Sequence, residues 1–452
     1  MTGAWPGYPP AVSAGGFCFI SGTLGVNDDG VLVNGWSDLP DEGRVLASGP
    51  AYVDALEGAP GAQAWAAFRR ARTLLDDRGA AFGDVLQMHL YQKAKRFFPV
   101  FERIRRLYEP DAPAPASGIG VGIGGAGEDA WFALDGIAID PAAWPFGERR
   151  RVLRHADEQA PGSHYSQAVL AGPYIFLAGQ LPLDHGRPGN PMVRGYDDVP
   201  EEGRLLQVGR SHPDFRDGPI AAQTWFTYAK IRRILEAAGS QLDDLVAVTV
   251  FLQDMKDYAT FHRVHERSLA GAHPALTVVE AREVGHKGTL IEIEAVAMRR
   301  ERGLAHRAIA PATGGTGAHS VPGRLAGPLL FVSGQLGVNP AGDAVAEFSD
   351  LPRTARPHAQ AVIRMTGRPA ATVQAFAIFE RVDAILREAG LARSAMARIM
   401  LYVENVADMT PFDLACRHYL GDRRPAFSCV VVPSVGPVRG TRLCVEAIAV
   451  VG

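Results

Sequence analysis

The sequence is poor in cysteine, with four in 452 residues. No two of them form a C-x-x-C pair, and no Cys and His group has the spacing of a zinc site. A chain this long is therefore not a disulfide scaffold, and we expect neither a metal nor a cofactor. So few cysteines are typical of a reducing compartment, which predicts a cytoplasmic protein.

Long apolar runs and an excess of basic residues are also missing. No apolar run reaches the roughly 18 residues of a membrane span, and the first residues lack the basic region and apolar core of a signal peptide. The formal net charge is −3, whereas phosphate binding favours a basic face. We therefore expect no membrane and no nucleic-acid partner, and predict a small molecule as the ligand.

One nine-residue segment occurs three times along the chain. It is FISGTLGVN at 19–27, FLAGQLPLD at 176–184 and FVSGQLGVN at 331–339. These copies lie about 155 residues apart, far more than the roughly 20–50 residues of a solenoid unit. The pattern predicts a tandem of three whole domains, with boundaries at 1–145, 160–300 and 318–452.

Other landmarks keep the same order within each repeat. A segment opened by an aromatic-x-Asp-(Leu/Val)-Pro motif follows the first strands, at 36–40, 196–200 and 348–352. We expect it to be a loop or hairpin at a cleft mouth, or a flap that packs neighbouring repeats. Amphipathic helices, apolar strands, second helices and closing strands come next. Each repeat is therefore predicted to be an α+β domain with its helices on one face of a sheet.

Two stretches between the repeats differ in composition from the rest. Residues 141–162 are rich in Pro and basic residues, and residues 299–323 are rich in Arg, Gly and Ala. Both are too polar and too interrupted to form a core, so we expect linkers there.

The second repeat carries a set of motifs that resembles a known family. In order, these are HYSQAV, FLAGQLPLD, HPALTVVEA and LIEIEAVA. The set closely resembles the RidA/YjgF family of enamine/imine deaminases; the third repeat matches well and the first is the most diverged. The resemblance implies a chorismate-mutase-like α+β fold and an assembly of three subunits with sites in the clefts between them.

That likeness suggests why the chain repeats itself. We expect the three repeats to form one intrachain pseudo-trimer, because linked partners reach high effective concentration. The alternative is three independent domains on linkers. Further association of the whole chain into a homo-oligomer stays open.

The family's carboxylate-binding arginine follows a Pro-Ala step, and this chain lacks it. The matching positions are Ser117, Leu276 and Phe427. A desolvated carboxylate without a cationic partner is costly, so ordinary deamination of small 2-imino acids is not expected. Arg44 and Arg204, in the segments that follow the Asp-(Leu/Val)-Pro motifs, are candidate replacements.

The other family positions are scattered among the repeats. The resemblance implies a carboxylate at Glu292, where the first and third repeats have Ala133 and Cys444, and a cleft tyrosine at Tyr165. We predict Glu292 as the acid or base and Tyr165 as a hydroxyl that orients the substrate, with Leu276 as an apolar wall. A glutamate with a purely structural role is the alternative for Glu292.

Further substrate-binding positions are implied by the same motifs. They are Ser21, Ser117, Gln180, Ser333 and Phe427. The predicted function is a diverged enzyme acting on a small imine, enamine or related reactive metabolite at a cleft between repeats. The alternative is a non-catalytic metabolite-binding or scaffold protein, and ribonuclease activity is disfavoured by the acidic balance.

Three other features are predicted to carry no chemistry. GVGIGG at 120–125 fits the glycine pattern of a dinucleotide site, but a strand, not a helix, is expected after it. Cys429 and Cys444 could face each other across strands, although free buried thiols are the preferred interpretation. His262 is predicted to be a surface residue of a helix.

Overall fold

The computed structural model describes residues 5–49, 52–123, 129–154, 164–209, 211–269, 271–300, 304–311 and 320–452. Parts of both predicted linkers, at 155–162, 301–303 and 312–319, lie outside these residues, as do the last two positions of GVGIGG. Among the described residues, no helix is long and apolar enough to cross a membrane.

The first unit is a mixed β-sheet with two helices. Its strands are β1 (Ala11–Ala14), β2 (Phe17–Leu24), β3 (Val85–Gln92), β4 (Ala116–Gly120) and β6 (Phe132–Ile139). Helix α1 (Tyr52–Asp76) connects β2 to β3, and α2 (Phe98–Tyr108) leads back to β4, which pairs parallel to β3. The strand order is β1-β2-β6-β3-β4-β12.

The other two units repeat this order of elements. The second has β7 (Arg151–Leu153), β8 (Ala168–Ala171), β9 (Tyr174–Gln180), α3 (His212–Ala237), β10 (Leu245–Leu252), α4 (Tyr258–Leu269), β11 (Ala275–Glu280), β12 (Glu283–Val284) and β13 (Ile291–Met298). The third has β14 (His306–Ile309), β15 (Gly323–Ala326), β16 (Leu329–Leu336), α5 (Arg356–Thr366), α6 (Pro369–Glu388), β17 (Met396–Val403), α7 (Met409–Leu420), β18 (Ala426–Val431) and β19 (Leu443–Val450).

Short strands pass from one unit to the sheet of another. β12 of the second unit pairs with β4 of the first, and β5 (Gly122–Ile123) of the first pairs with β18 of the third. A Cβ on Gly120 would lie 2.6 Å from the Cβ of Glu283, so the glycine permits this close pairing. The described part of GVGIGG therefore forms strands, and the next described regular element is β6, as the sequence predicts.

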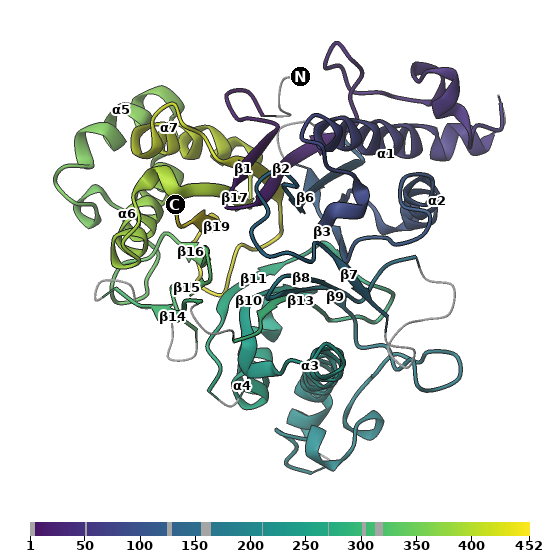
Figure 1. Cartoon of the computed structure of the whole chain (residues 1–452). Helices are drawn as coiled ribbons and strands as arrows, with labels where there is room; N and C mark the ends of the chain where they lie inside the picture. The colour runs from purple at the N-terminus through teal and green to yellow at the C-terminus, as the bar shows by residue number, and fades with distance from the viewer. Residues whose placement is uncertain are drawn as a thin grey trace.

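The three sheets face one another around a shared core, with the helices on the outside (Figure 1). Strand β4 contacts β9, β11 contacts β16, and β18 contacts β2, so each unit touches both others. One buried apolar cluster takes residues from all three units, including Phe17, Phe176 and Phe331. The strands explain this shared core, because each sheet is apolar on both faces. One face packs against the helices of its own unit, and the other is buried by the sheets of the other units.

Several expectations about connecting segments are wrong. The segment after the Asp-Leu-Pro motif of the third unit forms helix α5 rather than a loop or hairpin, because Ala359 and Val362 give it a buried face. The predicted linkers contain β7 and β14, which extend the edges of the second and third sheets.

The four cysteines are free and buried. Cys429 lies on β18 and Cys444 on β19, and β17 is hydrogen-bonded between these two strands. The two thiols therefore do not face each other on adjacent strands, and the preferred interpretation of free thiols is confirmed.

Candidate functional site

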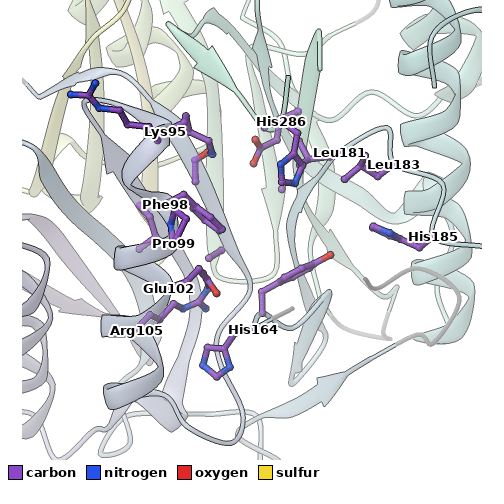
Figure 2. A pocket seen from close by; sticks show the side chains of 18 of the residues that line it. Lys95, Phe98, Pro99, Glu102, Arg105, His164, Leu181, Leu183, His185 and His286 are labelled. Carbon is purple, nitrogen blue, oxygen red and sulfur yellow. Dashed lines mark hydrogen bonds and ion pairs between the residues drawn. The ribbon is translucent and has the colours of Figure 1, made fainter. Parts of the chain in front are cut away.

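A cavity of about 730 Å³ lies between the first and second units. The first unit contributes α2, the turn before it and β4, and the second contributes the segment before β8, the end of β9 and β13. Figure 2 shows Phe98, Pro99 and Glu102 on one side of it and Leu181, Leu183 and His286 on the other. The volume is in the range of small-molecule sites.

Glu292 is the buried carboxylate of this cavity. It lies on β13, is 3 % exposed and packs over the backbone of β9, where a Cβ on Gly179 would be 2.0 Å from its Oε1. Burial raises the pKa of Glu292 to about 7; nearby Lys95 opposes the rise and Glu294 adds to it. A carboxyl group with this pKa can both accept and donate a proton near neutral pH.

Lys95 approaches the same end of the cavity from the first unit. It begins the turn before α2, its backbone N–H donates to the Glu283 carboxylate at 2.7 Å, and its Nζ donates to the Gly118 carbonyl at 2.5 Å. Burial lowers the pKa of the Lys95 ammonium, against the attraction of Glu292. Lys95 belongs to none of the motifs from which the site was predicted.

Three histidines also line the cavity. Burial lowers the pKa of His164 and of His286, and it lowers the pKa of His185 to about 4. All three imidazoles are therefore neutral at pH 7 and can donate or accept hydrogen bonds without adding charge. Tyr165 lines the cavity beside His164, so the structure brings the predicted Tyr165 and Glu292 into one cavity.

Ser117, where the resemblance implies an arginine, is fully buried beside the cavity, between Ala116 and Gly118, which line it. The Cβ position of Gly179 is 2.9 Å from Ser117 Oγ as well as close to Glu292. The Ser117 hydroxyl donates to the Glu294 carboxylate, two residues along β13 from Glu292. Ser117 therefore connects the cavity to a buried polar cluster behind it.

That cluster combines charges from all three units. His89 donates from Nδ1 to Asp135 at 2.6 Å and from Nε2 to Glu294 at 2.9 Å. Arg398 contacts Asp135 at 3.3 Å and Glu446 at 3.9 Å. Burial disfavours the charge of His89, but Glu294 and Asp135 outweigh it and raise its pKa to about 10. Asp135, Glu294 and Glu446 are equivalent in the three repeats. Each lies on the closing strand, two residues after the position that Glu292 occupies in the second repeat.

The second predicted cleft, between the second and third units, holds Leu276 and Ser333. The Ser333 hydroxyl accepts the Leu276 backbone N–H at 3.0 Å and donates to the Val321 carbonyl. Leu276 packs in the apolar core of the second unit. The expectation that Leu276 forms a wall beside Glu292 is wrong, because β11 lies at the interface with the third unit.

The third predicted cleft, between the third and first units, is filled by aromatic side chains. Phe427 stacks on Tyr8 at 4.2 Å between ring centroids and meets the edge of Trp5 at 5.7 Å. Ser21 accepts the Phe427 backbone N–H at 2.9 Å and donates to the Pro9 carbonyl at 2.6 Å. In this cleft and the second one, the cleft serines bond to backbone groups of two segments.

The remaining candidates lie away from the cavity. Gln180 turns its side chain to the Ala178 carbonyl, because alternate residues of β9 face opposite sides. Arg44 donates to carbonyls of its own loop, as Arg204 does to that of Val199, and neither lines the cavity. His262 pairs with Glu266 at 3.0 Å on the partly exposed face of α4.

One signal in the sequence could have found Lys95. The residue that begins the equivalent turn is Met255 in the second unit and Val406 in the third. A lysine that replaces two apolar residues at a repeated position is a local departure from the pattern of the chain. Its meaning needed the fold, because only the pairing of units shows that it approaches Glu292.

The comparison with family models matches the second and third units. The family model described as Endoribonuclease L-PSP matches residues 156–299 and 315–451, which is more than half of the chain. The chain therefore belongs to this family.

Individual relatives match about one third of the chain each. A RutC family protein of Pyrococcus horikoshii is 35% identical over 150 residues, which cover 33% of this chain and 98% of the relative. The 2-iminobutanoate/2-iminopropanoate deaminase of Salmonella typhimurium is 29% identical over 150 residues, covering 32% of this chain and 96% of that enzyme. The chain is thus related to imine deaminases.

Solved structures show the same proportion. RidA from an Antarctic Psychrobacter is 26% identical and covers 33% of this chain and 98% of its own, with a TM-score of 0.26. This score is low, so the fold rests on the strand order and connections described above.

Proposed function

We propose that the chain is a diverged imine deaminase-like enzyme that hydrolyses a small imine or enamine in the cavity between the first and second units. The observation that carries the proposal is the buried Glu292 carboxyl, whose pKa is raised to about 7 by burial. Titrating carboxyl groups of this kind in a cavity are typical of acid–base catalysis. The same cavity contains the Tyr165 hydroxyl and the Lys95 amine.

The reaction needs one group that exchanges protons with water and with the leaving nitrogen. Glu292 takes a proton from water as the water oxygen bonds to the C=N carbon. It gives this proton to the nitrogen to form a carbinolamine, and then passes the remaining hydroxyl proton to the same nitrogen, which leaves as ammonia as the carbonyl forms. Tyr165, which lines the same cavity, orients the substrate, and the apolar side chains of Phe98 and Leu181 keep bulk water away.

We further propose that the three units, predicted at 1–145, 160–300 and 318–452 and extended by β7 and β14, are the covalent equivalent of a three-subunit assembly. The cyclic contacts of β4 with β9, β11 with β16, and β18 with β2 support this arrangement. X-ray scattering tests it, since a compact chain of this length has a radius of gyration of about 22 Å. A much larger value would indicate separate domains on linkers.

The proposed activity is tested with imines made by an amino-acid oxidase. The imine from alanine and the bulkier imine from leucine are generated in place, and what survives is trapped with semicarbazide. We expect the protein to remove at least one of them faster, because Arg96 and Arg106 line the cavity and can pair with the carboxylate of these imines in place of the missing arginine. Glu292→Gln should lower the rate by about 100-fold or more, and Tyr165→Phe should lower it less.

A matched control uses the equivalent strand position of the third unit. Cys444→Ser changes the residue that occupies the place of Glu292 there and should leave the rate unchanged. A Glu292→Gln protein as active as the wild type would remove Glu292 from the mechanism. Failure of the wild type to accelerate the loss of any imine would end the proposal.

The second candidate is a metabolite-binding protein without turnover. The observation that favours it is that Ser117, Leu276 and Phe427 stand where the resemblance implies a carboxylate-binding arginine. Calorimetric titration with pyruvate distinguishes the two candidates, since binding with no loss of any imine would support this one.

A further inference from the structure

We propose that Lys95 is a catalytic residue that forms a Schiff base with the substrate carbon in the cavity between the first and second units. This inference rests on the proposed function, because it adds a covalent step to the same hydrolysis. It extends the substrate class to carbonyl compounds, which can condense with the Lys95 amine to give the same Schiff base.

The position of the Lys95 amine is set by two neighbouring strands. The turn that carries it is held through its backbone N–H by Glu283 of β12, and the amine itself is held by the Gly118 carbonyl on β4. These two strands are hydrogen-bonded to each other although they come from different units. The Gly118 anchor thus lies within the first unit, and the Glu283 anchor depends on the association of the first and second units.

The place of the amine is open to a small molecule. Gly118 has no side chain, and a Cβ built on it would lie 3.4 Å from Lys95 Nζ. Both Gly118 and Lys95 line the cavity. A substrate carbon can thus approach Nζ over the bare backbone of β4.

The side-chain amide of Gln92 also lies close to Gly118. Gln92 Nε2 lies 3.1 Å from the Gly118 Cβ position, and Gln92 is fully buried. Neither its Oε1 nor its Nε2 has a hydrogen-bond partner among the described residues. A buried amide without partners is costly, and the hydroxyl of a carbinolamine bound to Lys95 would satisfy it.

The groups needed for the covalent route occur together in one cleft. The residues equivalent to Lys95 are Met255 and Val406, and those equivalent to Glu292 are Ala133 and Cys444. Among the charges around Lys95, Glu292 acts on it most strongly. An amine in a desolvated site beside a carboxyl that titrates near pH 7 has the arrangement of a Schiff-base enzyme.

The steps balance without another reactant. Neutral Lys95 bonds to the imine carbon. The substrate nitrogen takes one proton from the Lys95 nitrogen and one from Glu292 and leaves as ammonia, which gives a protonated Schiff base and a Glu292 carboxylate. Water then bonds to the carbon of the Schiff base and gives a proton to Glu292. The Lys95 nitrogen takes that proton, the bond between carbon and Lys95 breaks, and the hydroxyl proton passes to Glu292 as the carbonyl product forms.

The test is reductive trapping. The protein is incubated with pyruvate and sodium borohydride, and digested peptides are analysed by mass spectrometry. We expect one reduced pyruvyl group on Lys95. Lys95→Arg, which keeps the charge but cannot form the Schiff base, should not be trapped and should hydrolyse the alanine-derived imine about 100-fold more slowly.

Two further variants control the experiment. Lys93→Arg changes a nearby lysine that lies over the Trp131 ring and should leave both trapping and rate unchanged. Lys95→Met introduces the residue of the second unit, so it suits the turn and should fold even if the arginine variant does not.

The outcomes separate the inference from the function on which it rests. Hydrolysis that survives in Lys95→Arg or Lys95→Met, or a wild type that hydrolyses imines but gives no adduct at Lys95, overturns the Schiff base and leaves the proposed function intact. A wild type that neither hydrolyses imines nor is trapped overturns both.

Discussion

The carboxylate of Glu292 lies against the backbone of Gly179, with its Oε1 2.0 Å from the place that a Cβ of residue 179 would take. This contact joins two neighbouring strands, β13 and β9, at the wall of the cavity. A side chain at residue 179 would therefore displace the Glu292 carboxylate from this position.

Gly179→Ala should consequently displace the Glu292 carboxylate and lower imine hydrolysis by about 10-fold or more. Gly334→Ala is the matched control, because Gly334 is the same motif glycine in the third unit and its Cβ would meet Cys444 Sγ at 2.9 Å. Both variants should lose some stability in thermal unfolding. Only the first should lose activity, and equal activity of the two would contradict the assigned contact.

The raised pKa of Glu292 predicts how stability depends on pH. The folded protein holds this proton up to about pH 7, whereas the unfolded chain releases it near pH 4.5, the ordinary pKa of a glutamate. The free energy of unfolding should therefore fall as pH rises between these values, by at most about 3 kcal/mol from this group.

Glu292→Gln has no such proton to lose, so its stability relative to the wild type should increase from pH 5 to pH 8. Urea unfolding at the two pH values measures this difference. A difference that stays constant with pH would show that the carboxyl is not held protonated by burial.

Arg398 offsets buried negative charge where the three units meet. It is 3 % exposed and contacts Asp135 at 3.3 Å, and together with His89 it lowers the pKa of Asp135 well below its usual range despite burial. Arg398→Met should lower the free energy of unfolding by about 3–5 kcal/mol, since it leaves a buried carboxylate without its partner. Arg393→Met, which removes a more exposed pair with Asp383, should cost about 1 kcal/mol or less in the same urea titration.

Trp5 packs in the third cleft, where it is 2 % exposed and contacts the Phe427 ring. Trp5→Ala should lower stability by about 3–5 kcal/mol because it leaves a cavity in a packed aromatic group. Imine hydrolysis at the site between the first and second units should be unchanged after correction for folded protein. A specific loss of activity in this variant would mean that the third cleft takes part in catalysis.

The sequence by itself determined the repeated elements, because each depends on local periodicity. Apolar residues at helical spacing predict helices α1, α3 and α6, and the apolar runs that follow them predict strands. The resemblance also identified Glu292 and Tyr165, which the structure places in one cavity. Helix α5 was missed because a Pro-rich start and scattered apolar residues obscure its buried face.

The tertiary structure alone decided which residues share a cleft. Leu276 and Glu292 belong to one repeat and were expected at one site, but β11 and β13 face different neighbours. Lys95 approaches Glu292 only because β12 crosses to pair with β4. Contacts between repeats depend on how three sheets pack against one another, and the periodicity within one repeat contains no information about that packing.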